Sequence, residues 1–492
     1  MKSPFQTIFS VLSHFSQKNQ SQIFFVFLIF FTGICISAFD LRQPMFAELD
    51  AYSRTNMAYA YAQKNIFFDQ YQTVWLPLHF TFLSLILKIY SHTFILLRVF
   101  SLFFSLLTVI AVYYQTFLFS QNRKTSILAT LLYLFLPFRL LLSTQTLGEN
   151  FFAFFLVTAL ILLCGKKHLF LSILLLNVAH GIRFESWYVV PFLALYISWI
   201  KEFSLRKKCL IFLGYLIFPI FYVLLNYAHQ HSFLSFFREK VIFAHQFILP
   251  EQGNLITSFQ SWWSIVGKVF SPLFSWIFLI TGAGIFYSKK NTITSAQLLI
   301  ISIPILIFLS LVIQVYSGSM EWLPPRYLFL IPIFGVTVVS QGLVITFEKI
   351  RGKKRKFFFV CICIVSIVSS YYFLFKEKHS ENLQKTPFNS LPYRQNFFQT
   401  VEKYKELKQK EDTLIFLSHP GGKSYVEQPF YYFAHEVANE DIGAPKFSVQ
   451  NIQDFAGQSN IIVMEKGMLP SNFVSLYENE QFLIVRAVQT DR

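Results

Sequence analysis

Long apolar segments alternate with short polar connections up to residue 375 of the chain. A helix needs about 20 predominantly apolar residues to cross the hydrocarbon core of a bilayer. The pattern predicts about eleven such helices, at residues 23–39, 94–119, 126–143, 150–164, 168–180, 187–200, 209–227, 272–287, 294–316, 327–347 and 357–375. The segments 150–164 and 168–180 are short for a straight crossing. We expect them to tilt less than their neighbours or to thin the bilayer locally.

The basic residues indicate the orientation of these helices. Lys and Arg cluster in every second connection, at Arg123 and Lys124, Lys166 and Lys167, residues 201–208, Lys289 and Lys290, and residues 349–356. The other connections carry acidic residues, namely Glu149, Glu185, Glu239, Glu251 and Glu321. Since Lys and Arg are enriched in cytoplasmic loops, we place the basic connections in the cytoplasm and the acidic ones outside. The N-terminus is then inside and the C-terminus outside.

One further apolar segment, residues 76–90, would break this alternation if it crossed the membrane. A crossing there would move every later basic connection to the outer side. We therefore predict that the segment LPLHFTFLSLILKIY forms an interfacial or re-entrant helix. It would pack under a first outer loop of residues 40–93.

The composition agrees with a multi-pass membrane protein. Hydrophobic residues make up 54% of the chain and charged residues only 14%, which excludes a soluble globular protein. The net charge of +16 would suggest a nucleic-acid partner in a soluble chain. Here the basic residues lie in short connections, so the charge reports topology and we expect no nucleic-acid partner. The 5 cysteines lie in or beside apolar segments and predict neither a disulfide framework nor a closed zinc site.

After residue 375 the composition becomes mixed and charged, as in a soluble domain. The pattern there predicts helices at residues 393–410 and 429–436 and strands at 413–417, 460–464 and 481–488. The expected fold is thus an all-α polytopic membrane domain, residues 1–375, followed by a small extracytoplasmic α/β domain, residues 376–492.

The segment that follows the first predicted span carries an unusual group of charges. Glu48, Asp50 and Arg54 lie there, at the outer end of a membrane helix. Asp50 and Arg54 are four residues apart, so they share one face of a helix. Because charged groups at a membrane are costly, a functional site is the first interpretation. A capped surface helix with a solvated ion pair is the alternative.

Four further polar groups are predicted on the same side of the membrane. They are Trp75 and His79 with Arg98, then Glu149, then His180 with Arg183 and Glu185, and finally Glu321 with Arg326 and Tyr327. Each group alone has an ordinary structural role, such as a snorkelling arginine, an interfacial tryptophan, a helix cap, an ion pair or a hydrogen-bonded histidine. Their convergence on one face favours a single functional site.

The chemistry that suits such a site is transfer from a polyprenyl-phosphate lipid. A carboxylate at the membrane surface can take a proton from an acceptor hydroxyl or amine. Arginine side chains can neutralise the departing phosphate, since their planar fork matches phosphate oxygens. Sugar transfer passes through an oxocarbenium-like state, so stabilising the leaving phosphate is a large electrostatic task.

Several of these residues also occur in an order that resembles a known family. They are Leu49-Asp50-Ala51-Tyr52, the Trp-Leu-Pro-Leu-His segment at 75–79, Leu97-Arg98-Val99, Glu149 and the segment GIRFESW at 181–187. This layout, over residues 23–347, resembles glycosyltransferases of the GT-C superfamily. That group contains protein O-mannosyltransferases, the lipid A aminoarabinose transferase and bacterial family 39-type enzymes.

The resemblance implies roles for three residues. Asp50 would be the catalytic base, and Glu149 the second acid of the catalytic cavity. Arg326 would contact the lipid phosphate. In some members the acids hold a divalent metal, which here would be Mg²⁺ or Mn²⁺ on Asp50 and Glu149. The chain departs from the commonest pattern, because Asp50 has no second acid beside it and residue 149 is Glu rather than Asp.

The sequence as a whole predicts an inverting glycosyltransferase of a bacterial inner membrane. Its donor would be a polyprenyl-phosphate-linked sugar, its site and C-terminal domain would be periplasmic, and its acceptor is a lipid, a glycan or a protein. One rival is a transporter or flippase of lipid-linked glycan, which would usually show paired repeats or broken helices. Another is a structural membrane protein whose C-terminal domain binds a partner, but it leaves the polar groups unexplained.

Overall fold

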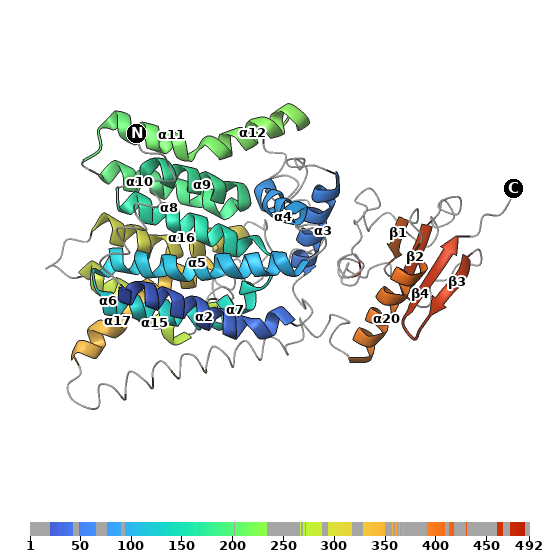
Figure 1. Cartoon of the computed structure of the whole chain (residues 1–492). Coiled ribbons are helices and arrows are strands. Elements are labelled where there is room, and N and C mark those ends of the chain that lie inside the picture. Colours follow the sequence, from blue (N-terminus) through green and yellow to red (C-terminus); the bar gives the residue numbers. More distant parts are fainter. Residues whose placement is uncertain are drawn as a thin grey trace.

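A computed structural model of the chain describes residues 20–42, 49–64, 76–89, 94–166, 168–200, 202–233, 272–287, 294–316, 328–349, 391–408, 413–417, 460–465 and 473–487, with residues 266, 269, 270, 357, 361, 364, 368 and 430. Most of these residues form a bundle of helices that run side by side (Figure 1). One continuous apolar core extends through the bundle from α2 to α17.

The central helix of the bundle is α5 (Phe94–Ser120), which packs against α6 and α8. The other bundle helices are α2 (Gln20–Arg42), α6 (Arg123–Leu134), α7 (Pro137–Ser143), α8 (Gly148–Cys164), α9 (Leu169–Ile182), the 3-10 helix η1 (Phe184–Val189), α10 (Val190–Trp199), α11 (Leu205–Tyr215), α12 (Ile217–Gln230), α15 (Pro272–Tyr287), α16 (Ser295–Tyr316) and α17 (Leu330–Lys349).

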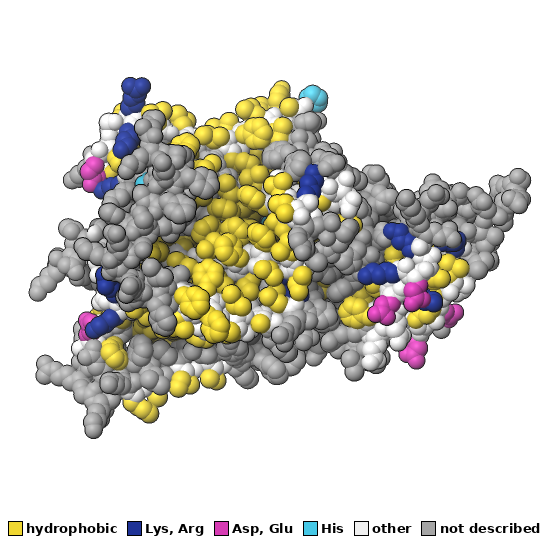
Figure 2. Space-filling view, viewed as in Figure 1, with side chains coloured by type: hydrophobic (Ala, Val, Ile, Leu, Met, Phe, Trp, Pro, Cys, Tyr) yellow, Lys and Arg dark blue, Asp and Glu magenta, His cyan; other side chains and the backbone are white. Residues whose placement is uncertain are grey.

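Three described helical segments are long and apolar enough to cross a membrane, namely Ile95–Ser120, Ala296–Ile313 and Leu330–Glu348. A fourth is present among the described residues if α11 and α12, bent by 49°, form one span. Figure 2 shows hydrophobic side chains over the middle of the bundle and Lys and Arg side chains gathered at its left end. The chain is therefore a membrane protein, and the number of eleven spans stays a prediction. The predicted last span, 357–375, lies largely outside the described residues.

Two of the predicted spans contain a break, and prolines explain both breaks. The span predicted at 126–143 divides into α6 and α7, and Leu136 is extended with ψ 118°. Pro137 follows directly, and a residue before proline avoids the helical conformation. The span predicted at 209–227 bends between α11 and α12. Pro219 lacks an N–H for the carbonyl of Tyr215, and its ring displaces that carbonyl.

Two short helices lie beside one end of the bundle (Figure 1). They are α3 (Leu49–Lys64) and α4 (Pro77–Ile89), which pack against each other. With 13 residues, α4 is about 20 Å long, well short of a hydrocarbon core of about 30 Å. The interfacial or re-entrant position predicted for 76–90 stays a prediction.

The C-terminal part of the chain forms a four-stranded sheet of order β1-β2-β4-β3. The strands are β1 (Thr413–Leu417), β2 (Asn460–Glu465), β3 (Phe473–Glu478) and β4 (Phe482–Ala487), and the helix α20 (Leu391–Leu407) packs on β3 and β4. β1 is parallel to β2, and the other pairs are antiparallel.

Three of these strands lie where strands were predicted, but β3 was missed. Its sequence, FVSLYE, has no regular alternation of polar and apolar residues, and its pairing with β4 shifts register between Ser475 and Tyr477. The helix predicted at 429–436 lies outside the described residues, apart from Phe430. The division of the chain at residue 375 stays a prediction.

Close packing at Gly335 gives a first testable prediction. A Cβ atom added there would lie 2.8 and 2.9 Å from ring atoms of Phe270, which is buried. We expect Gly335→Ala to lower the free energy of unfolding by about 1–3 kcal/mol, as overpacked cores do. Gly282→Ala is the matched control, because its Cβ would meet nothing within 4 Å. Thermal unfolding in detergent micelles measures both, and equal transition temperatures would contradict the prediction.

Candidate functional site

Three charged side chains from two neighbouring parts of the bundle meet in a buried cluster. Glu149 lies in the first turn of α8, Arg183 follows α9, and Glu185 lies in η1. Arg183 Nη1 donates to Glu149 Oε1 at 2.5 Å, and Arg183 Nε donates to Glu185 Oε2 at 3.1 Å. Arg183 Nη2 also pairs with Glu185 Oε1. One guanidinium thus joins two carboxylates, and all three side chains are buried.

The local structure explains how this cluster is tolerated. The first turn of a helix leaves backbone N–H groups exposed and carries the positive end of the helix dipole. Glu149 lies in that turn of α8, whose N-cap residue, Leu147, provides no side-chain cap. The carboxylate is therefore stabilised by the helix dipole and by Arg183 together. Burial of such a group costs several kcal/mol unless it is paired in this way.

A second polar pair lies next to the same turn. Arg54 of α3 and His79 of α4 are buried, and Arg54 Nη1 is 3.4 Å from His79 Nδ1. A Cβ atom added at Gly148 would lie 3.4 Å from Arg54 Nη1 and 3.6 Å from His79 Cγ. The first turn of α8 thus touches α3 and α4 at a residue with no side chain.

Burial, with help from neighbouring charges, keeps His79 neutral. His79 lies in α4, outside the segments long enough to cross a membrane. Burial lowers its pKa well below the ordinary value, and the guanidinium groups of Arg54 and Arg183 lower it further. His79 is therefore an uncharged group beside the Glu149–Arg183 pair at physiological pH.

His180 supports the turn that carries Arg183. Its Nδ1 is 2.7 Å from Ser186 Oγ, and Ser186 Oγ donates to Arg183 O at 2.7 Å. Because the hydroxyl has one proton, His180 Nδ1 is the donor to Ser186. Trp187 Nε1 donates to His180 O at 3.1 Å. These bonds fix the backbone at Arg183.

Arg98 holds the connection between α7 and α8. Its Nε donates to Thr144 O at 3.2 Å and its Nη1 to Leu41 O at 3.4 Å. The side chain is buried, so it does not snorkel to the membrane surface. Arg98 is thus an anchor for the chain that leads to Glu149.

The segment before α17 also reaches the cluster. The Arg183 guanidinium lies 5.7 Å from the centre of the Phe329 ring, within cation–π range. Phe329 also packs edge-on against Phe152 of α8. Residues far apart in the sequence therefore surround one guanidinium.

The backbone of Asp50 lies in the first turn of α3, beside the connection that leads to Glu149. Thr146 Oγ1 donates to the carbonyl of Ala51, the next residue, at 2.9 Å. The carboxylate of Asp50 lies outside the described part of the structure. The same holds for the predicted site residues Glu48, Trp75, Glu321, Arg326 and Tyr327.

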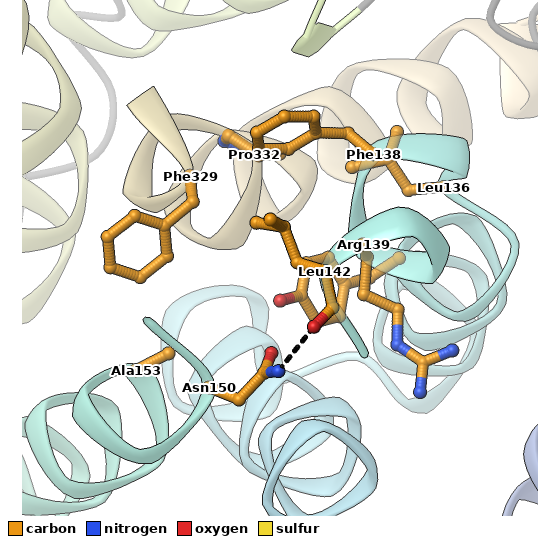
Figure 3. Close-up of a pocket in the computed structure, with 9 residues that line it drawn as sticks. Leu136, Phe138, Arg139, Leu142, Asn150, Ala153, Phe329 and Pro332 are labelled. Carbon is orange, nitrogen blue, oxygen red and sulfur yellow. Dashed lines mark hydrogen bonds between the residues drawn. The ribbon is translucent and has the colours of Figure 1, made fainter. Parts of the chain in front are cut away.

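Several neutral residues of the site were missed from the sequence. Asn150 Nδ2 donates to Leu142 O and to Ser101 Oγ, both at 2.8 Å. Figure 3 shows the first of these bonds beside a small cavity between α7, α8 and the start of α17. Its volume of about 10 Å³ is room for about one water molecule, so it does not hold a sugar.

The divalent ion that Glu149 was predicted to share with Asp50 stays a prediction, because the Asp50 carboxylate lies outside the described part of the structure. Glu149 is bound through Oε1 to Arg183, so an ion there would lie against a guanidinium. Among the described residues, no group of three or more His, Cys, Asp or Glu side chains could hold a metal. The positive charge between the two glutamates comes from Arg183.

Comparison with known proteins finds the same fold in solved structures. ArnT from Cupriavidus metallidurans bound to undecaprenyl phosphate matches with a TM-score of 0.60 and 10% identity, over 95% of this chain and 97% of that one. The oligosaccharyltransferase of Archaeoglobus fulgidus in the apo form matches with a TM-score of 0.57 and 11% identity, over 91% and 70%. Its complex with zinc and sulfate gives 0.54 and 13%, over 89% and 68%. No family model and no curated protein matches the sequence.

Proposed function

Since the chain has a GT-C-like fold, we propose that it is a membrane glycosyltransferase. It moves a sugar from a polyprenyl-phosphate donor to an acceptor at the outer face of a bacterial inner membrane. The observation that carries this proposal is the buried Glu149–Arg183–Glu185 cluster beside the start of α3. One of the structures that share this fold contains undecaprenyl phosphate.

The reaction assigns separate roles to acid and base groups. Asp50, in the first turn of α3, takes the proton from the acceptor as the acceptor attacks the anomeric carbon of the sugar. The bond between that carbon and the phosphate oxygen breaks with inversion, and polyprenyl phosphate leaves. Arg326 receives the phosphate charge, because a guanidinium grips two phosphate oxygens at once.

In this proposal Glu149 is not a second acid that exchanges a proton during the reaction. Its ion pair with Arg183 makes it a fixed part of the site, and Arg183 gains a second carboxylate from Glu185. A preorganised cluster of this kind supplies a constant electrostatic field without reorganising during the reaction. Asp50 is then the acid that exchanges a proton.

The position of the site in the bundle supports an outer-face assignment. Lys166 and Lys207 both lie in basic connections. Lys166 pairs with Glu202, and the Lys207 ammonium lies over the ring of Phe203. The basic end of the bundle is the left end in Figure 2, and α3 and α4 lie at the opposite end in Figure 1. In most membrane proteins the end that is rich in Lys and Arg faces the cytoplasm. The outer leaflet is therefore the one from which the donor enters in this proposal.

Broken helices favour a transporter as the second candidate. The α6–α7 and α11–α12 breaks are features that a transporter would use for alternating access. Both breaks have a local cause in Pro137 and Pro219, however. A transporter moves the donor intact, whereas a transferase cleaves its sugar–phosphate bond.

Oriented membrane vesicles test the proposal. Right-side-out and inside-out vesicles are prepared. Polyprenyl-phosphate hexose, labelled in the sugar, is inserted into the leaflet that faces the medium. We expect label to pass to an acceptor only in right-side-out vesicles that contain the protein. Intact labelled donor crossing to the inner leaflet, with no loss of its sugar, would support the transporter instead. Transfer confined to inside-out vesicles would contradict the outer-face assignment.

A further inference from the structure

A buried group of hydroxyls joins the start of α3 to the chain that leads into α8. Thr146 Oγ1 lies 2.9 Å from Ala51 O and 2.6 Å from Thr55 Oγ1. Thr55 Oγ1 in turn lies 2.8 Å from Ala51 O. All three residues are fully buried. Ala51 contributes only its backbone carbonyl, and none of the three has a role in the reaction described above. The three oxygens form a closed triangle.

Proton counting shows what each hydroxyl contributes to the triangle. The carbonyl only accepts, so two hydroxyl protons serve three contacts and one contact holds no proton at any moment. In every arrangement at least one proton lies between Thr146 and α3. Thr55 and Ala51 belong to the same helix, so their bond is internal to α3. Thr146 is on a different segment, so its bond to Ala51 O joins the two parts of the chain. Loss of the Thr146 hydroxyl would remove this link and leave the bond within α3 in place.

The segment on the far side of this link is itself fixed to the central helix. Ser101 Oγ of α5 donates to Gln145 O, and Arg98 Nε of α5 donates to Thr144 O at 3.2 Å. Asn150 Nδ2 of α8 donates to Ser101 Oγ at 2.8 Å. The connection from α7 to α8 is therefore a rigid support, and Thr146 extends that support to α3.

The positions of the linked residues connect this geometry to the site. Ala51 directly follows Asp50, and Thr146 precedes Glu149 by three residues. We propose that Thr146 is a positioning residue, whose hydroxyl holds the first turn of α3, and Asp50 with it, in register with the Glu149–Arg183 pair. The inference rests on the proposed function, because it requires Asp50 to be the base.

This role predicts a loss of turnover rather than of donor binding. A base that is misplaced by about 1 Å costs about 100-fold in rate. Thr146→Val removes the hydroxyl and keeps the shape of the side chain, whereas Thr146→Ser keeps the hydroxyl. We expect Thr146→Val to lower kcat by about 10- to 100-fold with KM for the donor nearly unchanged. Thr146→Ser should restore most of the wild-type kcat.

The test uses the full-length protein in detergent with labelled polyprenyl-phosphate hexose, together with hydrogen exchange. The amides of α3 should exchange faster in Thr146→Val than in wild type or Thr146→Ser, while those of α5 stay unchanged. If Thr146→Val does not fold, Thr146→Cys gives the same readouts, because a thiol is a similarly sized but weak donor.

Three results would overturn the inference. They are unchanged exchange of α3 in Thr146→Val, a rise in KM with an unchanged kcat, and equal losses in the Val and Ser variants. If the wild-type protein transfers no sugar, the proposed function fails by itself. Hydrogen exchange then still decides whether Thr146 holds α3.

Discussion

We expect the replacement of Asp50 by Asn to abolish sugar transfer by the purified protein. Removal of a general base costs about 10²- to 10⁴-fold in rate, and the amide of Asn cannot accept the acceptor's proton. Asp50 lies in the first turn of α3, next to the link between Ala51 and Thr146. Asn has the same size and can keep the same backbone, so we expect the thermal unfolding temperature to stay near that of wild type. Turnover of labelled polyprenyl-phosphate hexose in detergent measures the loss.

The matched control for this variant is Glu202→Gln. Glu202 is exposed, pairs with Lys166 and lies in a basic connection. The same change from carboxylate to amide there should leave turnover unchanged. Full activity of Asp50→Asn would remove the base assignment, and equal losses in both variants would point to a general effect of charge.

Arg183→Met is the second change with a large expected effect. It leaves Glu149 and Glu185 buried without the guanidinium between them. Breaking a buried ion pair by removing one partner costs about 3–5 kcal/mol. We expect the free energy of unfolding to fall by that amount, with a strong decrease in thermal stability in detergent. Arg206→Met, on the exposed face of α11, is the control and should change little.

A double variant separates lost charge compensation from lost packing. Glu149→Gln added to Arg183→Met removes one of the carboxylates that the first change leaves uncompensated. We therefore expect the double variant to be more stable than Arg183→Met alone. A double variant that is less stable, or an Arg183→Met protein as stable as wild type, would show that the ion pair does not hold the cluster together.

The helices were predictable because an apolar run of sufficient length has few alternatives in a membrane. The segments that became α2, α5, α15 and α16 were placed within a few residues of their observed bounds. The breaks before Pro137 and Pro219 were not predicted, because both prolines lie inside continuous apolar runs. In such a run the hydrophobic pattern is the same on both sides of the proline, although the helical hydrogen bonding is interrupted there.

Only the charged residues of the site could be predicted from the sequence. Charged residues are scarce near a membrane, so Glu149, Arg183 and Glu185 could be placed together, and the structure brings them into contact. Thr146 and Ser101 were missed, because neutral polar residues in an apolar chain give no comparable signal. Thr146 binds a residue 95 positions away, and no periodicity in the sequence indicates such a pairing.

Cleavage of the donor in detergent micelles tests the central claim most directly. A micelle does not have two leaflets, so a transporter cannot move intact donor from one leaflet to the other. The measurement is the release of free polyprenyl phosphate from labelled polyprenyl-phosphate hexose, with a membrane extract as the source of acceptor. The account predicts that the wild-type protein releases polyprenyl phosphate and that label appears in the acceptor fraction. With Asp50→Asn, neither released polyprenyl phosphate nor labelled acceptor is expected. Donor that stays intact with the folded wild-type protein would contradict it.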